Sequence, residues 1–460
     1  MLDPDLHPIT RPESTHMDAQ PLTEQVSSTL EPKQNPEWSG MKAVVTSSLI
    51  GTTIEWFDFF AYSTAAALVL NALFFPTYDP VVGTILAFGG IAVGYFGRPL
   101  GSIVFGHYGD KIGRKSMLVI SLIAMGGATF AIGLLPTYDA IGVTAPILLM
   151  TLRFIQGFAL GGEWGGAVLM VVEHSPPKRR GLFGSAPQSG LALGLTLSTL
   201  TFLALGQLPD AAFESWGWRV PFLLSATLVI VGLVIRLKIS ETPAFKALRD
   251  SNERVDMPIV ETLRNHWKPV VLAALCFANV GAIFYALFTF SITYGTTHIG
   301  LSRNTMLLVA VACSVVAFFG IPVAGALSDR LGRRIVFSTG IVLTVIVAFP
   351  MFWLIDSGSI TLTVIGYLLA TVGFCASYGT LGILYAEAFT VSIRYTGMSL
   401  ALGIGTVLGS AFVPIIYLEL LSTFGGSWAI SLYIVATGVI SIFSVRALTS
   451  PKSRVGLDAE

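Results

Sequence analysis

Charged residues are scarce in this chain. They make up 12% of its 460 residues, whereas 53% are hydrophobic; soluble globular proteins average about 25% charged residues. A soluble core cannot hide that much apolar surface, but a lipid bilayer can, so the composition predicts a membrane protein. The 27 basic and 27 acidic residues balance, so no excess of positive charge indicates a nucleic-acid partner.

Other absences exclude whole classes of function. The three cysteines, Cys276, Cys313 and Cys375, lie in apolar runs, where they are more typical of packing than of a disulfide or a metal site. No Gly-x-x-x-x-Gly-Lys-Ser/Thr phosphate-binding loop is present, which argues against an ATP-driven pump. No nucleophile–base pair or set of metal ligands stands out either, so we expect neither an enzyme nor a bound cofactor.

Long apolar runs dominate the rest of the chain. Twelve of them follow a polar stretch, residues 1–40, for which we expect a disordered tail. Each run approaches the ~20 residues that span a bilayer, and backbone groups in lipid must bond to one another, so each run is predicted to be a helix. The predicted fold is an all-α membrane protein with spans at 43–72, 81–105, 116–136, 145–172, 182–207, 219–238, 269–296, 304–327, 335–355, 360–387, 395–421 and 427–447.

Lysine and arginine are unevenly distributed among the predicted loops. The loops after the even-numbered spans are basic, whereas those between spans 1 and 2, 3 and 4, 9 and 10, and 11 and 12 contain no lysine or arginine. Basic loops stay in the cytoplasm. The pattern therefore predicts a multi-pass protein in the lipid bilayer with both termini cytoplasmic.

A decapeptide after the second span recurs after the eighth. Its members Gly106, Asp110, Gly113, Arg114 and Lys115 return, each 219 positions later, as Gly325, Asp329, Gly332, Arg333 and Arg334. A repeat between membrane-length segments indicates a duplicated half. The predicted division is a tail at 1–40, a six-helix half at 41–238, a cytoplasmic linker at 239–268, a second six-helix half at 269–447 and a tail at 448–460.

The decapeptides also predict a gate. Asp110 and Asp329 follow the ends of helices, and the glycines permit tight turns. Their basic residues can pair with acids or helix C-termini elsewhere and hold the inner side closed, and Glu387 and Arg394, beside the loop after span 10, are assigned to the same gate. The alternative is that the basic residues only set topology, but this does not explain why Asp and Gly repeat at the same offsets.

Two acids lie inside the first span. Glu55 and Asp58 are three residues apart and share a helix face, which Tyr62 continues. A charge at the centre of a bilayer costs at least a few kcal/mol, and two neighbouring carboxylates resist joint ionisation. We assign both acids to proton coupling and Tyr62 to substrate binding; the alternative is a structural ion pair with a base on a neighbouring helix.

Two further spans carry buried charge. Arg98, before Pro99 in span 2, can hold a substrate carboxylate with two hydrogen bonds or neutralise Glu55 or Asp58, and the sequence leaves both open. Span 4 contains Arg153 and Glu163, which we assign to proton coupling, and Gln156 and Trp164, which we assign to substrate binding.

The second half has little buried charge. Its polar candidates for substrate binding are Asn279, Tyr285 and Tyr378, although each by itself is more typical of packing or interhelical hydrogen bonding. We therefore expect the coupling chemistry mainly in the N-terminal half.

Glycines recur along span 4. Gly157, Gly161 and Gly165 form a ridge of small residues, which permits a neighbouring helix to approach closely. Packing is a stronger interpretation of these glycines than ligand contact.

These motifs resemble a known family. Both decapeptides resemble the signature loop of the major facilitator superfamily, and Arg153-x-x-Gln-Gly157 resembles a second superfamily motif whose arginine is linked with proton coupling. Segments across about 43–447 look like the metabolite:proton symporter family, which includes bacterial shikimate, α-ketoglutarate and proline/betaine transporters: Ile54-Glu-Trp-Phe-Asp-Phe-Phe60, Arg98-Pro-Leu-Gly101, Gly161-Gly-Glu-Trp-Gly-Gly166, Gly217-Trp-Arg-Val-Pro-Phe222 and Arg394-Tyr-Thr-Gly397.

The resemblance implies a symporter of a bacterial cytoplasmic membrane, which we expect to be a monomer. It would import a small polar metabolite together with protons, with the proton gradient as its energy source, by alternating access between two halves. The span 4 motif favours an organic acid such as shikimate or a dicarboxylate. The alternatives are a zwitterionic osmolyte such as proline or glycine betaine, and a proton-driven exporter; the segment Gly184–Gly190 lacks the antiporter pattern, which disfavours export.

Overall fold

The computed structural model describes residues 38–78, 80–238, 241–242 and 257–448. Within these ranges every regular element is a helix. The predicted tails lie almost entirely outside the described residues, as does about half of the predicted linker. The part of the linker that is described contains a short helix that the sequence analysis did not predict, α13 (Pro258–Asn265).

The N-terminal half contains six long helical segments, each close to a predicted span. Span 1 continues through a π-helical turn, and span 5 starts with two short 3₁₀ turns. The elements are α2 (Trp38–Ala65), η1 (Ala66–Leu70), α3 (Asn71–Phe74), α4 (Pro80–Ile112), α5 (Arg114–Leu134), α6 (Tyr138–Ile141), α7 (Thr144–His174), η2 (Pro177–Arg179), α8 (Arg180–Ser185), η3 (Ala186–Ser189), α9 (Gly190–Leu205), α10 (Asp210–Ser215), η4 (Gly217–Arg219) and α11 (Val220–Leu237).

The C-terminal half repeats this arrangement. Spans 7 and 11 contain π-helical turns, and the other spans are single helices. The elements are α14 (Trp267–Tyr285), η5 (Ala286–Phe290), α15 (Ser291–Thr293), η6 (Tyr294–His298), α16 (Arg303–Leu331), α17 (Arg333–Asp356), α18 (Ile360–Ala388), α19 (Arg394–Thr406), η7 (Val407–Ala411), α20 (Val413–Phe424) and α21 (Trp428–Leu448).

The predicted all-helical membrane architecture is confirmed. Among the described residues, ten helices are long and apolar enough to cross a bilayer. The first span, bent by 42° between Met41–Ala65 and Leu68–Phe74, makes an eleventh, and the 33-residue α4 is the twelfth long segment. At ~1.5 Å per residue, α4 exceeds the thickness of the hydrocarbon core.

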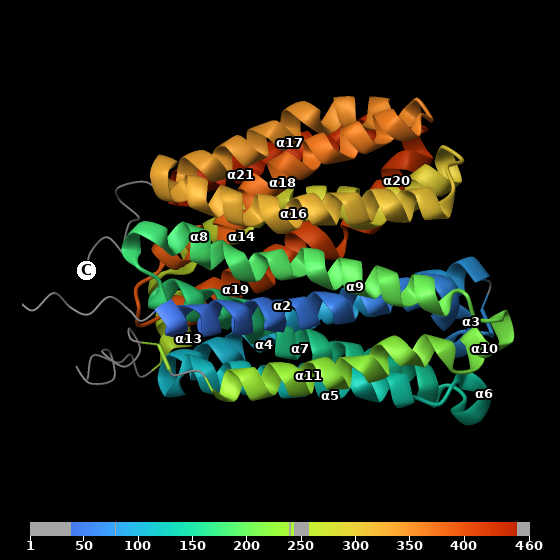
Figure 1. Cartoon of the computed structure of the whole chain (residues 1–460), viewed down its shortest axis with the longest axis horizontal. Helices are drawn as coiled ribbons and strands as arrows, with labels where there is room; N and C mark the ends of the chain where they lie inside the picture. The colour runs from blue at the N-terminus through green and yellow to red at the C-terminus, as the bar shows by residue number, and fades with distance from the viewer. Residues whose placement is uncertain (1–37, 79, 239–240, 243–256, 449–460) are drawn as a thin grey trace, which may run out of the picture.

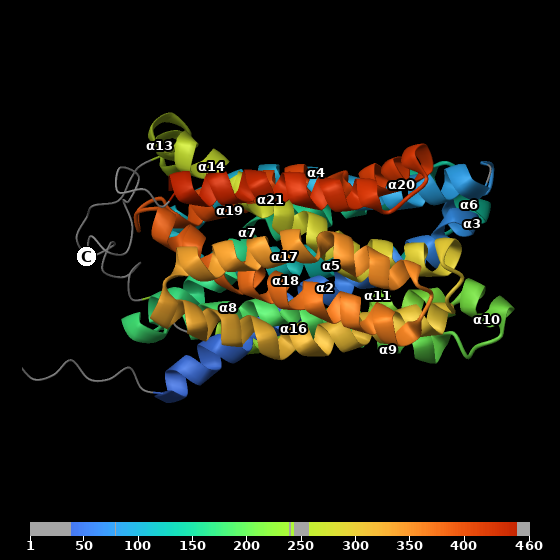
Figure 2. The ribbon, with the colours of Figure 1, turned by 90° about the horizontal axis from the view of Figure 1, so that it is seen from above.

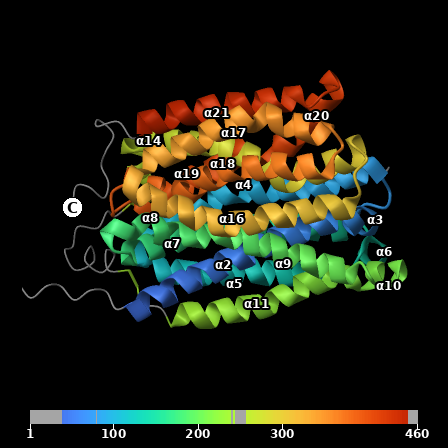
Figure 3. The ribbon, with the colours of Figure 1, turned by 45° about the horizontal axis from the view of Figure 1, so that its top comes forward.

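The helices run parallel or antiparallel to one long axis, in two halves. Figure 1 shows the N-terminal half (α2, α4, α5, α7, α9, α11) below the C-terminal half. Seen from above, α21, α17, α18 and α16 follow one another across the C-terminal half (Figure 2). The halves meet where α16 packs on α8 and α9 (Figure 3) and where α4 packs on α19.

A second feature of the chain repeats between the halves. The π-helical turns η1 and η5 start at residues 66 and 286, nearly the same offset as between the two decapeptides. Each turn follows the central part of the first span of its half. Such turns are frequent at functional sites, and their matched places agree with the predicted duplication.

Close packing between α4 and α7 fixes the positions of the buried arginines. A side chain at Gly157 would collide with the backbone carbonyl of Gly94, and one at Gly161 with the carbonyl of Arg98. The predicted packing role of these glycines is therefore confirmed. The contact sets Arg98 of α4 and Arg153 of α7 on facing helices in the N-terminal half.

Candidate transport site

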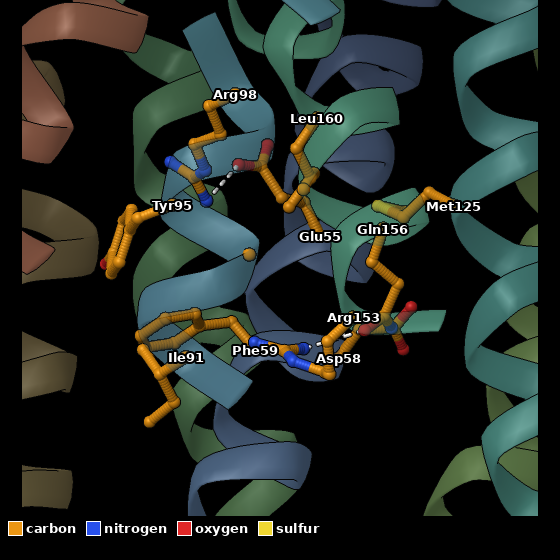
Figure 4. A pocket seen from close by; sticks show the side chains of 12 residues that line it. Glu55, Asp58, Phe59, Ile91, Tyr95, Arg98, Met125, Arg153, Gln156 and Leu160 are labelled. Carbon is orange, nitrogen blue, oxygen red and sulfur yellow. Dashed lines mark hydrogen bonds and ion pairs between the residues drawn. The ribbon is translucent and has the colours of Figure 1, made fainter. Parts of the chain in front are cut away.

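A chain of hydrogen bonds joins Asp58 to Arg153. The Thr129 hydroxyl on α5 donates to Asp58 Oδ2 (2.6 Å), Gln156 Nε2 donates to the same hydroxyl (2.5 Å), and Arg153 Nη1 donates to Gln156 Oε1 (2.7 Å). All four side chains are buried, and Figure 4 shows the side chains of Asp58, Gln156 and Arg153 side by side. Asp58 Oδ1 has no hydrogen-bond partner among the described residues. Helices α2, α5 and α7 thus share one charged network.

Other groups fix the guanidinium of Arg153. Its Nε donates to the Gly90 carbonyl (3.1 Å), and its Cζ lies 3.8 Å from the centroid of the Tyr62 ring, the geometry of a cation–π contact. The Tyr62 hydroxyl donates to the Ala87 carbonyl (2.9 Å). The structure thus places Tyr62 beneath Arg153, and its role in substrate binding stays a prediction.

Glu55 and Arg98 form a buried ion pair. Arg98 Nη2 lies 3.7 Å from Glu55 Oε1, and the two side chains are 9% and 4% exposed. Arg98 Cζ also lies 4.9 Å from the centroid of the Tyr95 ring. Glu55 Oε2 has no hydrogen-bond partner among the described residues. Of the two alternatives for Arg98, neutralisation of Glu55 is realised in this conformation.

Two cavities meet at this ion pair. The first lies within the N-terminal half, and the second lies between the halves. Glu55, Tyr95 and Arg98 line both. The first is lined also by Asp58, Phe59, Ile91, Gly94, Met125, Arg153, Gln156, Gly157 and Leu160. The second is lined also by Trp56, Trp164, Leu191, Phe277, Val280, Phe284, Phe374, Tyr378, Leu402, Thr406 and Ser410.

Aromatic rings and one amide organise the second cavity. Tyr378 stacks on Phe374 with ring centroids 5.1 Å apart. The Trp164 indole N–H donates to Gln188 Oε1 (3.2 Å), and Gln188 Nε2 donates to the Tyr378 carbonyl (2.6 Å). Predicted substrate residues Trp164 and Tyr378 therefore lie at one cavity and are joined by Gln188, which the sequence analysis did not single out.

The other two candidates of the second half have different surroundings. The Tyr285 hydroxyl donates to the Tyr95 hydroxyl across the halves (3.0 Å). Asn279 accepts from Thr344 (2.7 Å) and donates to the Ile434 carbonyl (2.9 Å). Tyr285 thus reaches the site through Tyr95, whereas Asn279 bonds helices α14, α17 and α21 together, the interhelical role that the sequence left open.

Glu163 forms an ion pair and is not among the residues that line either cavity. Its carboxylate contacts the Arg236 guanidinium at the end of α11 and accepts from the Ser121 hydroxyl (2.9 Å). Arg236 also donates to the Leu118 carbonyl (2.7 Å). The structure does not bring Glu163 together with Asp58, and the assignment of Glu163 to proton coupling stays a prediction.

The first decapeptide contacts the opposite half. Asp110 Oδ2 accepts from the Thr396 backbone N–H (2.8 Å) and hydroxyl (2.9 Å), and Asp110 Oδ1 accepts from the Tyr395 N–H (3.2 Å). The carboxylate thus binds the unpaired donors of the first turn of α19. Gly106 leaves room for this approach, because a side chain there would meet the Thr396 backbone.

Three further charged residues lie beside this contact. Arg114 Nη2 lies 3.1 Å from Glu173 Oε1 and 3.8 Å from Asp110 Oδ1, and Arg394 Nη1 lies 3.5 Å from the same Glu173 oxygen. Glu173 is on α7, and Arg394 is on α19 of the other half. The cluster therefore ties the halves together at the bundle end that carries α8 and α13, which we call the decapeptide end (left in Figure 1).

The second decapeptide makes the equivalent contact with the roles of the two halves exchanged. Asp329 Oδ1 accepts from the Gly181 N–H (2.7 Å) and Asp329 Oδ2 from the Leu182 N–H (2.9 Å), at the start of α8 in the N-terminal half. Arg333 lies 2.9 Å from Asp329 and 3.2 Å from Glu387. Gly325 packs against the Gly181 carbonyl, as Gly106 packs against Thr396.

The remaining gate candidates shape the loops. Gly113 (φ 121°) and Gly332 (φ 95°) adopt positive φ, which glycine permits without strain. Lys115 Nζ donates to the Leu237 carbonyl near the end of α11 (2.9 Å). Arg334 is exposed at the start of α17. The decapeptide residues therefore build two matched contacts, and their function as a gate stays a prediction.

Sequence reasoning missed several residues at these sites: Tyr95, Thr129, Glu173, Gln188 and Arg236. Only Glu173 carried a signal, because Glu173 and Glu387 stand at matching places, each seven residues before an arginine, Arg180 or Arg394. The others are single polar or basic residues in apolar helices, and only the packing shows what they contact.

A bundle of membrane-length helices in two halves, with charged residues buried between its helices, is the architecture of a membrane transporter. The chain matches the Major Facilitator Superfamily model over residues 48–414 and again over 296–459. It therefore belongs to this superfamily, as the sequence motifs predicted, and it is a multi-pass membrane transporter, not an enzyme.

Its similarity to particular transporters covers most of the chain. The Escherichia coli K12 inner membrane metabolite transport protein YhjE is 40% identical over 87% of this chain and 92% of its own length. The E. coli K12 shikimate transporter is 36% identical (88% and 93%), and the proline/betaine transporter of that strain is 32% identical (88% and 82%). A structure of the proton:xylose symporter XylE superposes with a TM-score of 0.76 at 15% identity over 90% of this chain and 96% of XylE, which shows the common fold.

Proposed function

We propose that this protein is a proton-coupled symporter that imports a small polar metabolite, most simply an organic acid. The observation that carries the proposal is the network of Asp58, Thr129, Gln156 and Arg153 at a cavity that shares Glu55 and Arg98 with the cavity between the halves. The network would hold the proton, and the shared residues would connect it to the substrate.

The chemistry of the network supports proton coupling. A buried carboxylate is stable when it is neutral or paired, so adding or removing one proton at Asp58 changes the balance of charge with Arg153. Asp58 contacts Arg153 only through Thr129 and Gln156, two neutral groups that can reorient. A proton at Asp58 would therefore alter hydrogen bonds between α2, α5 and α7 without breaking a direct ion pair.

The contacts at the decapeptide end support alternating access. They join the halves at that end through Asp110, Asp329 and the ion pairs around Glu173. We propose that they open in one step of the cycle, and that this end faces the cytoplasm of a bacterial inner membrane, because it carries the basic loops. Since one chain lines both cavities, a monomer suffices.

Arg98 supports an organic acid as the substrate, because a guanidinium can bind a carboxylate with two hydrogen bonds. A zwitterionic osmolyte is the second candidate. Trp56, Trp164 and Phe284 line the cavity near Glu55, and aromatic faces beside a carboxylate suit a quaternary ammonium group.

Proton movement in proteoliposomes tests the function. A dye inside the vesicles reports pH while unlabelled shikimate, quinate, α-ketoglutarate, citrate, proline or glycine betaine is added outside. We expect inward proton flow with at least one carboxylate and none in protein-free vesicles. Proton flow in the opposite direction to the substrate would indicate an exporter, and substrate uptake without any proton flow would contradict the proposal.

A further inference from the structure

The cavity between the halves contains one acid and one base. Glu55 and Arg98, both from the N-terminal half, are the charged residues among the described side chains that line it. The C-terminal half contributes only uncharged groups: Phe277, Val280, Phe284, Phe374, Tyr378, Leu402, Thr406 and Ser410. A bound molecule would therefore meet its one cation on one side and an aromatic and hydroxyl surface on the other.

The pair of Glu55 and Arg98 is loose. Its nitrogen–oxygen distance of 3.7 Å exceeds that of a charge-assisted hydrogen bond, about 2.7–2.9 Å. Glu55 Oε2 is buried and has no hydrogen-bond partner in the described part of the chain, although a buried carboxylate oxygen normally has one. The Tyr95 ring, 4.9 Å from Arg98 Cζ, lies beside the guanidinium. Arg98 is thus held near the cavity with its capacity for bidentate binding unused.

We propose that the substrate is a monocarboxylate with an uncharged body, and that its carboxylate replaces Glu55 as the partner of Arg98. This inference rests on the proposed symport. In the exchange, one proton is added to the Glu55 carboxylate, the Glu55–Arg98 ion pair breaks, and a carboxylate–Arg98 ion pair forms. The charge of the site is the same before and after, so one proton enters at Glu55 with each substrate anion, in addition to the proton proposed for the Asp58 network.

The other charged side chains around the cavities already have partners, so Glu55 is the acid that can take part in this exchange. Glu163 on α7 is paired with Arg236 of α11, and Asp58 is bonded to Thr129. Arg153 donates to Gln156 and Gly90. The titratable groups that line the cavities on the remaining sides are Tyr95 of α4 and Tyr378 of α18. Among the described acids, Glu55 is thus the one that both contacts Arg98 and lines the cavity between the halves.

The uncharged wall sets the specificity. A second carboxylate would leave water for a surface of Phe284, Phe374 and Tyr378, with no second cation among the described lining residues. An unpaired buried charge is costly. The hydroxyls of Thr406 and Ser410 can instead bind neutral polar groups. We therefore expect a compact monocarboxylate to bind at least tenfold more tightly than a dicarboxylate of similar size.

Counting protons during binding tests the exchange. The purified full-length protein is titrated in weakly buffered solution with shikimate (a cyclic monocarboxylate), α-ketoglutarate or glycine betaine. Fluorescence of Trp56 and Trp164, which line the cavity, reports binding, and an indicator dye reports protons. We expect shikimate to bind with uptake of about one proton. In the pH range in which Glu55 is ionised in the free protein, the affinity should fall about tenfold for each unit by which the pH rises.

Two amide variants separate the acids. Glu55→Gln cannot form the ion pair, so it should bind shikimate without proton uptake and with an affinity nearly independent of pH. Asp58→Asn should keep the proton uptake that accompanies binding. Glu214→Gln, an exposed residue of α10, is the matched control and should behave as the unmodified protein.

Two results would overturn the inference. One is proton uptake on shikimate binding that persists in Glu55→Gln; the other is α-ketoglutarate or glycine betaine binding to the unmodified protein as tightly as shikimate or more tightly. Because the proton count is made first on the unmodified protein, the test does not depend on how well the variants fold. The proposed symport has its own test, and substrate entry into proteoliposomes without protons would contradict it. Proton flow driven only by a dicarboxylate or a betaine would contradict this inference but would still support symport.

Discussion

Asp110 and Thr396 lie 286 positions apart in the chain, yet the Asp110 carboxylate accepts hydrogen bonds from both the backbone N–H and the hydroxyl of Thr396. Asp329 makes the corresponding contact with Gly181 and Leu182 in the other direction. Each half thus supplies a carboxylate that caps a helix of its partner half. The two halves are thereby joined through hydrogen bonds from a carboxylate of one half to backbone and hydroxyl groups of the other.

Removal of Asp110 or Asp329 should destabilise the first turn of only the helix that it caps, α19 or α8. Asp110→Ala removes an N-terminal cap worth about 1 kcal/mol, so hydrogen exchange of the Tyr395 and Thr396 amides should accelerate about fivefold while the Gly181 and Leu182 amides keep their rates. Asp329→Ala should do the reverse. Hydrogen–deuterium exchange with mass spectrometry measures both, and each variant is the control for the other. Equal acceleration at both helices in either variant would contradict two independent contacts.

Replacement of Arg98 by lysine should weaken the binding of carboxylate substrates more than that of other substrates. Arg98→Lys keeps the positive charge beside Glu55 but loses the planar fork that binds a carboxylate with two hydrogen bonds. We expect KM for a transported carboxylate to rise about tenfold or more, with a smaller effect on a zwitterion. Initial uptake rates in proteoliposomes give KM. An unchanged KM would refute a direct contact between Arg98 and the substrate.

Glu163→Gln should act on stability first. The change leaves Arg236 buried with an uncharged partner, and breaking a buried ion pair costs about 3–5 kcal/mol. The Tm of the purified protein should therefore fall clearly, whereas the exposed Glu214→Gln control should not change it. Thermal unfolding followed by tryptophan fluorescence measures this. A normal Tm combined with loss of proton-driven uptake would instead support the coupling role that the sequence predicted for Glu163.

Two glycines offer a matched test of packing. Gly157→Ala would place a methyl group against the Gly94 carbonyl, whereas a methyl group at Gly127 of α5 would meet nothing within 4 Å. Separation of α4 and α7 should destabilise the first variant by about 1–3 kcal/mol and leave the second near the unmodified Tm. Equal Tm values for the two variants would show that α4 and α7 can accommodate a methyl group at position 157 without loss of stability.

The fold was largely accessible from the sequence because bilayer physics leaves few choices. Apolar runs of membrane length predict helices, and the repeated decapeptides predict two halves. The predicted spans agree with the helices to within several residues, and the π-helical turns η1 and η5 lie at matching places. The bent first span and helix α13 were not predicted, since local composition says little about helix breaks or short surface helices.

The candidate site was only partly accessible. A charged residue is easily recognised within an apolar run of sequence, so the sequence identified Glu55, Asp58, Arg98 and Arg153. Their pairing could not, because it depends on which helices adjoin: the sequence left Arg98 a choice between Glu55 and Asp58, and packing places it by Glu55. Neutral residues such as Thr129 give no signal, although this one joins Asp58 to Gln156.

The most direct test of proton coupling compares accumulation with exchange in Asp58→Asn. Proteoliposomes that carry the variant are given labelled substrate either under a pH gradient or without a gradient but preloaded with unlabelled substrate. The asparagine keeps the size of the side chain but cannot carry a proton. We therefore expect accumulation under the pH gradient to fall, because only the proton that Glu55 takes up on binding stays coupled to the substrate, while exchange survives. Undiminished accumulation under the pH gradient would show that Asp58 does not carry the proton.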